Sequence, residues 1–174
     1  MDNLTFQPAA ENDLAAMLEL YNFYIMNTTA TFDHGKITPE EFRQRLFIGH
    51  EKYKTYLIRL GDDTVGFCFL TQYRKKAAYD RTAEIGLYLK PEFTGKGIGR
   101  LAVTFLEEIA VSKGIGVIIA SISGENTASI KLFQKMGYEK CAHYKQVGEK
   151  FGRFVDVVDY EKILVSCNNR HYLN

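Results

Sequence analysis

Two features of this 174-residue chain are suited to chemistry: a glycine-rich turn and a carboxylate on a predicted strand. The turn carries glycine at positions 95, 97 and 99 and leads into a predicted helix. Such a turn exposes backbone N–H groups, and the start of the helix adds the positive end of a dipole. The pattern predicts a phosphate cradle, and a glycine turn without a ligand is the alternative that spacing alone leaves open.

The turn differs from two common nucleotide-binding loops. It lacks the Gly-Lys-Ser/Thr ending of a Walker loop, and it is not a G-x-G-x-x-G turn early in a βαβ unit. No acidic residue follows a first βα turn at the position that would bind a ribose. A dinucleotide-dependent oxidoreductase is therefore disfavoured.

The carboxylate belongs to a stretch of alternating residues, 81–89, that reads as a strand. Ala83, Ile85, Leu87 and Leu89 share one face, and Glu84, Gly86 and Tyr88 share the other. A carboxylate and a phenol therefore lie on the same face across a glycine. A glutamate on a solvated strand face is the alternative interpretation of Glu84.

Basic and aromatic residues gather just before this strand. Within a short stretch the chain carries Arg74, Lys75, Lys76 and Arg81 together with Tyr73 and Tyr79. This local charge predicts an anion site, and Arg74 is suited to hold a carboxylate through two parallel hydrogen bonds. Solvated loop charges remain the alternative.

The elements around these residues alternate in a way that predicts an α/β fold with a mixed sheet. Leu4 to Pro8, residues 55–60, 64–70, 81–89, 117–122, 138–144 and 154–164 read as strands. Asn12 or Asp13 can cap a first helix, and Thr38-Pro39-Glu40-Glu41 is a capping box that begins a second helix ending near Gly49. Further helices are predicted from the glycine turn to Gly114, with Leu101, Phe105, Leu106 and Ile109 inside, and over residues 126–136.

Composition narrows the class of protein. The chain has 22 Lys+Arg, 21 Asp+Glu and 46% hydrophobic residues, which fits one domain over residues 1–164 and a C-terminal tail over 165–174. A formal net charge of +1 argues against a nucleic-acid-binding protein, and no apolar run is long enough to cross a membrane. The opening Met1-Asp2-Asn3 lacks the layout of a signal peptide, so we expect a cytoplasmic protein.

Cysteine and histidine usage predicts neither disulfides nor a metal. Cys68, Cys141 and Cys167 are odd in number and widely spaced, and the four histidines are scattered. Cys68 and Cys141 fall in predicted strands, where burial as small apolar residues is expected.

Several blocks together give a family resemblance. Leu87-Tyr88-Leu89-Lys90-Pro91, the 94–99 turn, Asn126, Ser129, Leu132 and Gly137-Tyr138 resemble the acetyl-CoA motif of the GNAT acetyltransferase superfamily. Further blocks resemble its phosphinothricin acetyltransferase branch: Tyr21-Asn22 with 29–32, Ala78-Tyr79 with 82–84, and Val147-Gly148 with 150–153. The resemblance implies a GNAT-like fold, a twisted and mostly antiparallel mixed sheet of about seven strands with about four helices. It also favours a homodimer.

The resemblance assigns a place to acetyl-CoA, the implied cosubstrate. Its pyrophosphate would lie on the backbone amides of the loop, and its pantetheine arm would pair with the strand edge at Leu87 and Leu89, with Asn126 on the other side. The implied cofactor-binding residues are Leu87, Leu89, Thr94, Gly95, Lys96, Gly97, Ile98, Gly99, Arg100, Asn126 and Ser129.

The resemblance also implies a reaction, N-acetylation of the α-amine of a small amino-acid-like substrate such as phosphinothricin or methionine sulfoximine or sulfone. Glu84 matches the family's catalytic glutamate and would remove the proton of the ammonium, directly or through a water, before the nitrogen attacks the thioester. Backbone N–H near Leu87 would meet the developing oxyanion, without a metal. The implied substrate-binding residues are Thr29, Thr31, Phe32, Arg74, Lys76, Tyr79 and Tyr88.

The chain departs from the family pattern at two positions. Thr94 stands where many members carry Arg or Gln, and Phe133 stands where many carry a tyrosine taken as the general acid. Phe133 cannot donate a proton, so no general acid is assigned. Two other functions stay open: a non-catalytic acyl-CoA-binding module, and a protein amine acetyltransferase, which would need an open groove.

Overall fold

A computed structural model describes residues 3–164, and the predicted tail at 165–174, with Cys167, lies outside the described residues. Within this range the chain forms one seven-stranded sheet in the order β1-β2-β3-β4-β5-β7-β6. Neighbouring strands are antiparallel except β4 and β5, which are parallel. The strands are β1 (Leu4–Pro8), β2 (Thr55–Leu60), β3 (Asp63–Gln72), β4 (Thr82–Leu89), β5 (Val117–Ser123), β6 (Glu139–Lys150) and β7 (Arg153–Ile163). The predicted mixed, mostly antiparallel sheet is confirmed.

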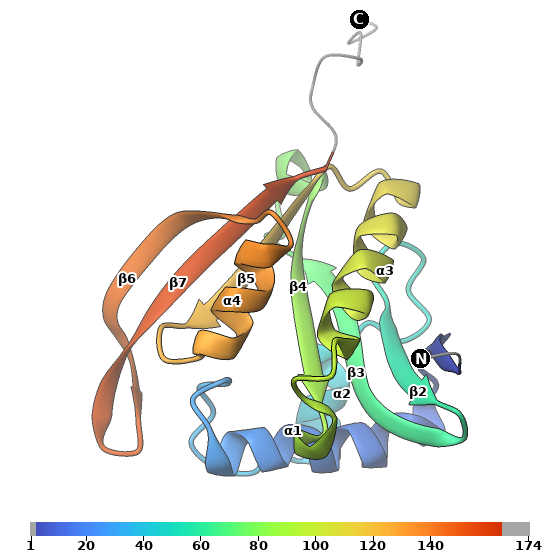
Figure 1. Cartoon of the computed structure of the whole chain (residues 1–174), viewed down its shortest axis with the longest axis horizontal. Coiled ribbons are helices and arrows are strands. Elements are labelled where there is room, and N and C mark those ends of the chain that lie inside the picture. The colour runs from blue at the N-terminus through green and yellow to red at the C-terminus, as the bar shows by residue number, and fades with distance from the viewer. Residues whose placement is uncertain (1–2, 165–174) are drawn as a thin grey trace, which may run out of the picture.

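Helices cover both faces of the sheet. The α-helices of the described part are α1 (Leu14–Asn27), α2 (Pro39–Arg45), α3 (Ile98–Ser112) and α4 (Thr127–Lys135), with short 3₁₀ turns at Glu11–Asp13, Ala77–Tyr79 and Pro91–Phe93. Figure 1 shows α3 and α4 on the near face, α2 behind the sheet and α1 across its lower end. The β6–β7 hairpin projects beyond the helices at the opposite edge from β1 and β2.

Two apolar cores follow from this layering. The larger core lies between the sheet and α3, where Ala102, Val103 and Leu106 are buried against strand residues such as Ile118. The smaller core lies between α1, α2 and the other face, and contains Met17, Phe42 and Phe67. The predicted inward stripe of α3 was shifted, because Leu101, Phe105 and Ile109 are only partly buried while Ala102, Val103 and Ala110 are fully buried.

The starts of α1 and α2 show which of the predicted helix caps form. The Thr38 hydroxyl accepts from the Glu41 N–H, and the Glu41 carboxylate accepts from the Thr38 N–H, so the predicted capping box is confirmed. That helix ends at Arg45 rather than near Gly49. Asp13 stands at the start of α1, but its carboxylate accepts from the Ala10 N–H and does not cap α1.

The two described cysteines differ in exposure. Cys68 on β3 is fully buried, and burial raises the pKa of its thiol far above the usual value. Cys141 on β6 is exposed, so the expectation that it is buried was wrong. The physical reason is that β6 is an edge strand, most of whose side chains face solvent.

Candidate functional site

The site lies where two parallel strands separate. β4 and β5 pair only through Thr82 to Glu84 and Val117 to Ile119. Beyond Glu84, β4 keeps its pairing with β3, and beyond Ile119, β5 keeps its pairing with β7. The facing backbone edges of residues 85–89 and 120–123 therefore lack each other as partners. An extended ligand can hydrogen-bond to an edge of this kind.

A pocket of about 740 Å³ lies at this separation. It is lined by both diverging strands, the glycine turn and α4. Predicted site residues that line it are Glu84, Leu87, Tyr88, Leu89, Thr94, Gly95, Gly97, Gly99, Arg100, Asn126 and Ser129. Residues separated by more than forty positions in the chain are thus brought together by the parallel β4–β5 pairing.

The glycine turn has the geometry of a backbone cradle. Gly95 and Gly97 adopt positive φ values of 72° and 81°, which side chains rarely tolerate, and α3 begins at the next residue, Ile98. The first N–H groups of α3 have no intrahelical partner and sit at the positive end of its dipole. The ring of Phe93 lies 5.2 Å from the Lys96 ammonium, and the side chain of Ile98 is buried in the core. Lys96 and Ile98 are not in the pocket lining, and the buried Ile98 can offer an anion only its backbone.

Helix α4 forms the other wall. The Asn126 side-chain oxygen accepts from the Ser129 N–H at 3.1 Å and caps this helix. The Asn126 amide nitrogen has no hydrogen-bond partner among residues 3–164, so it remains available to a ligand. At Gly99 a Cβ would lie 3.1 Å from Leu132, so the absence of a side chain there lets α3 approach α4 closely.

Glu84 stands in the pocket as a half-buried carboxylate. No hydrogen bond or ion pair to its side chain is formed by any described residue. Burial raises the pKa of this carboxyl, and the negative charge of Asp159 on β7 raises it further. An unpaired carboxylate with a raised pKa in a pocket is suited to accept a proton near neutral pH.

The end of β4 is packed by aromatic side chains from α1. The Tyr88 ring lies 5.2 Å from Tyr21 and 5.3 Å from Tyr24, and burial raises the pKa of Tyr88 well above its usual value. The Tyr24 hydroxyl donates to the Leu89 carbonyl at 2.6 Å. Since a carbonyl oxygen can accept two hydrogen bonds, Leu89 is not thereby closed to a ligand.

The loop after α1 forms a polar wall beside the pocket. The Thr29 hydroxyl bonds to Ser123 and Glu125, and Glu125 pairs with Arg153 of the β6–β7 hairpin. The Thr31 hydroxyl bonds instead to Tyr21 and Asp33. Ala30 lines the pocket, whereas the lining does not include Thr29, Thr31 or Phe32.

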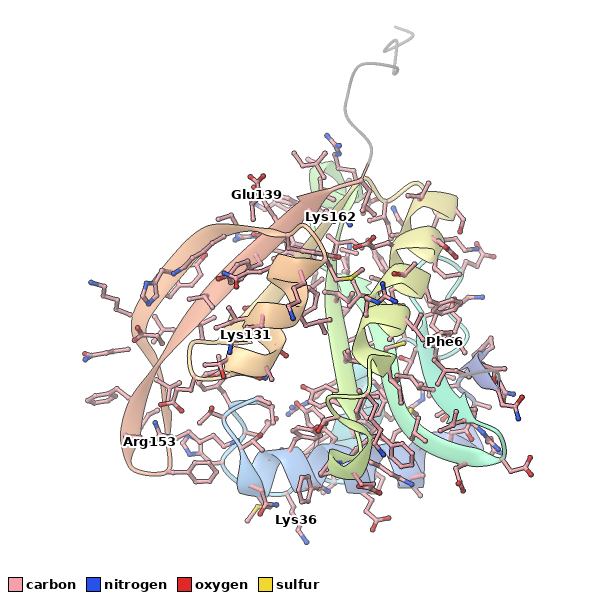
Figure 2. The ribbon with its side chains drawn as sticks, in the orientation of Figure 1. Phe6, Lys36, Lys131, Glu139, Arg153 and Lys162 are labelled. Atoms are coloured by element: carbon pink, nitrogen blue, oxygen red, sulfur yellow. The ribbon has the colours of Figure 1, made fainter. Side chains whose placement is uncertain are left out.

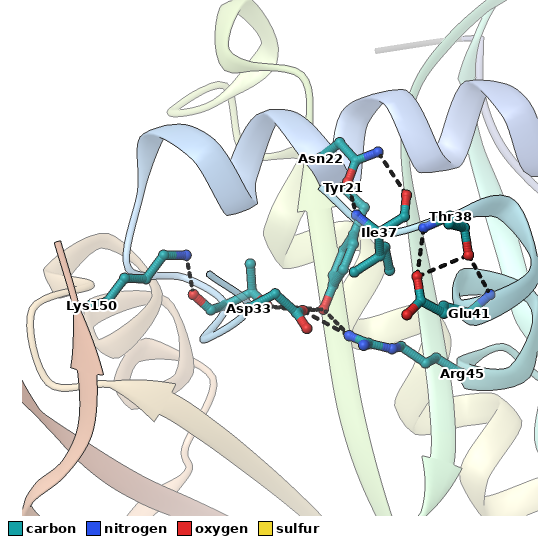
Figure 3. Close-up of polar contacts among 9 residues, drawn as sticks. Tyr21, Asn22, Asp33, Ile37, Thr38, Glu41, Arg45 and Lys150 are labelled. Atoms are coloured by element: carbon teal, nitrogen blue, oxygen red, sulfur yellow. Dashed lines mark hydrogen bonds and ion pairs between the residues drawn. The ribbon is translucent and has the colours of Figure 1, made fainter. Parts of the chain in front are cut away.

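The hairpin holds this wall in place through Lys150. Its side chain is 1% exposed, and its ammonium donates to the Thr31 carbonyl (Figure 3). Burial lowers the pKa of Lys150. The ring of Phe32 lies where a Cβ on Gly148 would be, so the loop and the hairpin are in direct contact. These contacts hold the loop after α1 against the β6–β7 hairpin.

The predicted anion-binding residues lie on the exposed loop between β3 and β4. The Arg74 guanidinium lies 5.0 Å from the Tyr73 ring and 5.6 Å from the Tyr79 ring. Arg74 and Lys76 are exposed, and Arg74, Lys76 and Tyr79 are not in the pocket lining. Their contact with a substrate stays a prediction.

Two groups of pocket residues were not predicted from the sequence. Lys131 and Lys135 line the pocket from α4 together with Arg100, and Figure 2 shows Lys131 on this helix. Their spacing of four residues on the helix that Asn126 caps was the signal that places them on one side. Tyr24 and Phe69 also line the pocket, but no local pattern relates them to Glu84.

Phe133 contributes an apolar ring to the α4 side of the pocket. Its ring lines the pocket, is 5% exposed and packs edge-on against Tyr138 at 4.9 Å. The apolar ring therefore fills its position on α4 without offering a proton.

Comparison with known proteins agrees with this geometry. Residues 15–138 match the Acetyltransferase (GNAT) family. The chain belongs to this acetyltransferase family. Acetyl-CoA is the cosubstrate of the family, and the open strand edge, the glycine cradle and α4 provide the surfaces that a phosphate-bearing pantetheine chain requires.

Individual GNAT relatives cover most of the chain. A phosphinothricin N-acetyltransferase of Streptomyces coelicolor is 34% identical over 91% of this chain and 95% of its own length. An N-acetyltransferase of Staphylococcus aureus Mu50 has a TM-score of 0.85 at 30% identity, covering 94% of this chain and 99% of its own. A phosphinothricin acetyltransferase of Sinorhizobium meliloti, solved with acetyl-CoA, has a TM-score of 0.85 at 28% identity, covering 93% and 89%. The resemblance to the phosphinothricin branch is therefore confirmed.

The described part of this GNAT chain has neither a cluster of metal ligands nor a membrane-spanning helix. No group of three His, Cys, Asp or Glu residues within 3–164 is placed to hold a metal ion. None of the helices in the same range is long and apolar enough to cross a membrane.

Proposed function

We propose that this enzyme transfers the acetyl group of acetyl-CoA to the α-amine of a small amino-acid-like acceptor. Phosphinothricin, methionine sulfoximine, methionine sulfone and related L-amino acids are the candidate acceptors. The observation that carries the proposal is the unpaired, half-buried Glu84 in the pocket between β4 and β5, with an anion cradle in the same lining. Support also comes from relatives named for these acceptors in Streptomyces coelicolor and Salmonella typhimurium.

The cosubstrate would be held by the backbone more than by side chains. Amides of Gly95 through Arg100 would receive the pyrophosphate, and the edge of β4 at Leu87 and Leu89 would receive the pantetheine arm. The Thr94 N–H, predicted to join them, already donates to the Pro91 carbonyl at 3.2 Å. Asn126 and Ser129 would contact the arm from α4. The positive φ of Gly95 and Gly97 and the missing β4–β5 pairing support this arrangement.

Glu84 would act as the general base. The acceptor enters as an ammonium, whose pKa lies near ~10, and its nitrogen becomes a nucleophile only after losing a proton. The Glu84 carboxylate would take this proton, directly or through a water, and the nitrogen would then form its bond to the acetyl carbon as the carbon–sulfur bond breaks. N–H groups of β4 near Leu87 would hold the charge that develops on the carbonyl oxygen.

The leaving thiolate would not need a proton from the enzyme. Phe133 cannot supply one, and the thiol that corresponds to the leaving group has a pKa near ~8.5. As the amide forms, the nitrogen loses its second proton to water or to the departing thiolate, so the reaction balances without a general acid.

The acceptor would enter on the side of Glu84 that faces α1 and the β6–β7 hairpin. Tyr88 would contact it from β4, and the wall at Thr29, Thr31 and Phe32 would enclose it. Arg74, Lys76 and Tyr79 would receive its acidic group after a movement of the exposed β3–β4 loop. The bonds from Lys150 and Glu125 that hold this wall favour a small acceptor over a protein amine.

We also infer a cytoplasmic homodimer. Val147, Phe151 and Phe154 are exposed on the projecting β6–β7 hairpin, and β6 is an edge strand. Exposed apolar residues beside an unpaired strand edge are a surface that a second copy can cover. Analytical ultracentrifugation tests this, since we expect twice the monomer mass, and a purely monomeric species at micromolar concentration would contradict it.

The test of function is release of CoA thiol from acetyl-CoA with a panel of acceptors. The panel contains phosphinothricin, methionine sulfoximine, methionine sulfone, ordinary L-amino acids, polyamines and a lysine peptide. We expect turnover with the acidic amino-acid analogues and little with polyamines or peptide. Binding of acetyl-CoA without turnover of any acceptor would favour a non-catalytic binding module, and peptide turnover would favour a protein acetyltransferase.

A further inference from the structure

Asp159 lies on the same sheet face as Glu84, on the far side of β5. Glu84 pairs with Ile119 on β5, and Ser121, two residues further along β5, pairs with Asp159 on β7. Paired residues of neighbouring strands share a face, and so do residues two apart on one strand. Ser121 is exposed and lines the pocket. Asp159 is therefore the β7 neighbour of a residue that lines the pocket, although it is not in the lining itself.

The carboxylate of Asp159 is not neutralised by the described residues. Its Oδ1 atom is buried and has no hydrogen-bond partner. Its charge raises the pKa of acidic groups around it: that of Glu84 in addition to burial, that of Tyr144, whose hydroxyl also interacts with it, and that of Cys141 in addition to burial and Glu161. A buried oxygen without a partner is costly, and contact with a ligand or a role in a reaction is one physical reason for such an atom.

Two cations on neighbouring segments, Arg74 and Lys162, have other contacts. Arg74 on the β3–β4 loop lies over the rings of Tyr73 and Tyr79. Lys162 on β7 is bonded to Glu107 and to the Met136 carbonyl. The neighbours of Glu84 on the adjoining strands, Thr71 and Ile119, are uncharged. Glu161, which pairs with Ile119, is a third carboxylate on this face, but of the two acidic residues on β7 it is Asp159 whose charge raises the pKa of Glu84.

We propose that Asp159 is a positioning residue of the acceptor site, which acts through Glu84 and draws the acceptor's ammonium toward it. The inference rests on the proposed function, in which Glu84 is the base. Two carboxylates on one face favour a cation between or beside them, and the amine must arrive in its cationic form before it is deprotonated. The negative charge of Asp159 also strengthens the affinity of Glu84 for a proton. This suits a base that takes a proton from the acceptor's ammonium near neutral pH.

A titration that needs no turnover tests this. Carbon-13 NMR of labelled glutamate carboxyls, with the Glu84 signal assigned by its loss in Glu84→Gln, measures the pKa of Glu84 in the folded enzyme. We expect Asp159→Asn to lower this pKa and Glu161→Gln to leave it unchanged. Glu161 is the matched control because it lies on the same strand face and its substitution removes the same charge. Asp159→Ala provides a second variant in case the asparagine perturbs folding.

Kinetics provide the second readout. In Asp159→Asn we expect the KM of the amine acceptor to rise by about fivefold, the scale of one partly exposed charge contact, with the KM of acetyl-CoA unchanged. The acid limb of kcat/KM should move to lower pH, because Glu84 loses its proton more easily. A merely structural role of Asp159 would not move this limb.

The outcomes separate the two proposals. An unchanged Glu84 pKa in both Asp159 variants would overturn the role of Asp159, whatever the activity. A lowered pKa in a protein that acetylates no amine would retain the coupling of the two carboxylates but overturn the proposed function. An acceptor KM that rises equally in Glu161→Gln would show a general charge effect and would also overturn the specific role of Asp159.

Discussion

Replacing Gly86 by alanine tests how closely the acceptor side of β4 is packed. Gly86 is paired with Phe69 on β3, and an added Cβ would lie under 3.0 Å from three atoms of the Phe69 ring. The ring cannot turn aside freely, because it is stacked with Phe67 and Tyr88 at centroid distances of 6.2 and 6.4 Å. The substitution therefore displaces an aromatic ring that lines the pocket.

The expected cost follows from two opposing effects. Overpacking costs about 1–3 kcal/mol, and the smaller conformational freedom of alanine in the unfolded chain returns about 0.4–1 kcal/mol. The net loss of about 1–2 kcal/mol corresponds to a Tm lower by ~2–8 °C for a domain of this size. The ring displacement should also raise the KM of the acceptor more than that of acetyl-CoA, whose cradle at Gly95 and Gly97 is not touched.

Thermal unfolding followed by circular dichroism measures this change. Gly35→Ala is the matched control, because a Cβ there meets nothing within 4 Å. The reasoning is refuted if Gly86→Ala and Gly35→Ala unfold at the same temperature, since the packing of Phe69 over Gly86 would then not resist a side chain.

Three further predictions follow from the site. Burial and Asp159 raise the folded-state pKa of Glu84 above its usual 4.5, so this carboxyl stabilises the fold below pH 4.5 and loses that contribution as pH rises through the folded pKa. Glu84→Gln should therefore unfold at a higher temperature than wild type at pH 7 but not at pH 4. Equal Tm values of the two proteins at pH 7 would contradict this. Asn126→Ala removes the α4 cap and should lower the free energy of unfolding, measured with denaturant, by about 1 kcal/mol. Asn126→Asp should keep the cap and weaken only acetyl-CoA binding. Equal stability of the two variants would contradict the role of Asn126 as the α4 cap. Replacing Lys131 and Lys135 by alanine should raise the KM of acetyl-CoA by about tenfold at low salt and less at high salt, and a salt-independent KM ratio would count against an electrostatic role.

Local patterns in the sequence predicted the elements well. The capping box at Thr38 and Glu41 forms as predicted because its partners are three residues apart. The alternation of 81–89 predicted which side chains of β4 share a face with Glu84, and the pairing of β4 with β3 agrees. The end of α2 was missed because no glycine cap marks Arg45 and the chain turns into an extended conformation at Leu46.

Contacts between segments far apart in the chain could not be predicted from the sequence. The open edge of β4 depends on where its parallel pairing with β5 ends, and no residue near Glu84 indicates this point in the sequence. The proximity of Asp159 arises from β7 inserting between β5 and β6, a topology that joins segments some forty residues apart. The bond from Lys150 to the Thr31 carbonyl spans an even longer separation and makes a lysine part of the interior.

The most direct test of the central claim is the kcat of Glu84→Gln measured beside its affinity for acetyl-CoA. The substitution keeps the size and position of the side chain but removes its ability to take a proton. If Glu84 is the general base, kcat falls by about 10²–10⁴-fold while the Kd of acetyl-CoA, measured by calorimetry, stays within about twofold of wild type. A variant that retains wild-type kcat with its best acceptor at pH 7 would contradict the role assigned to Glu84.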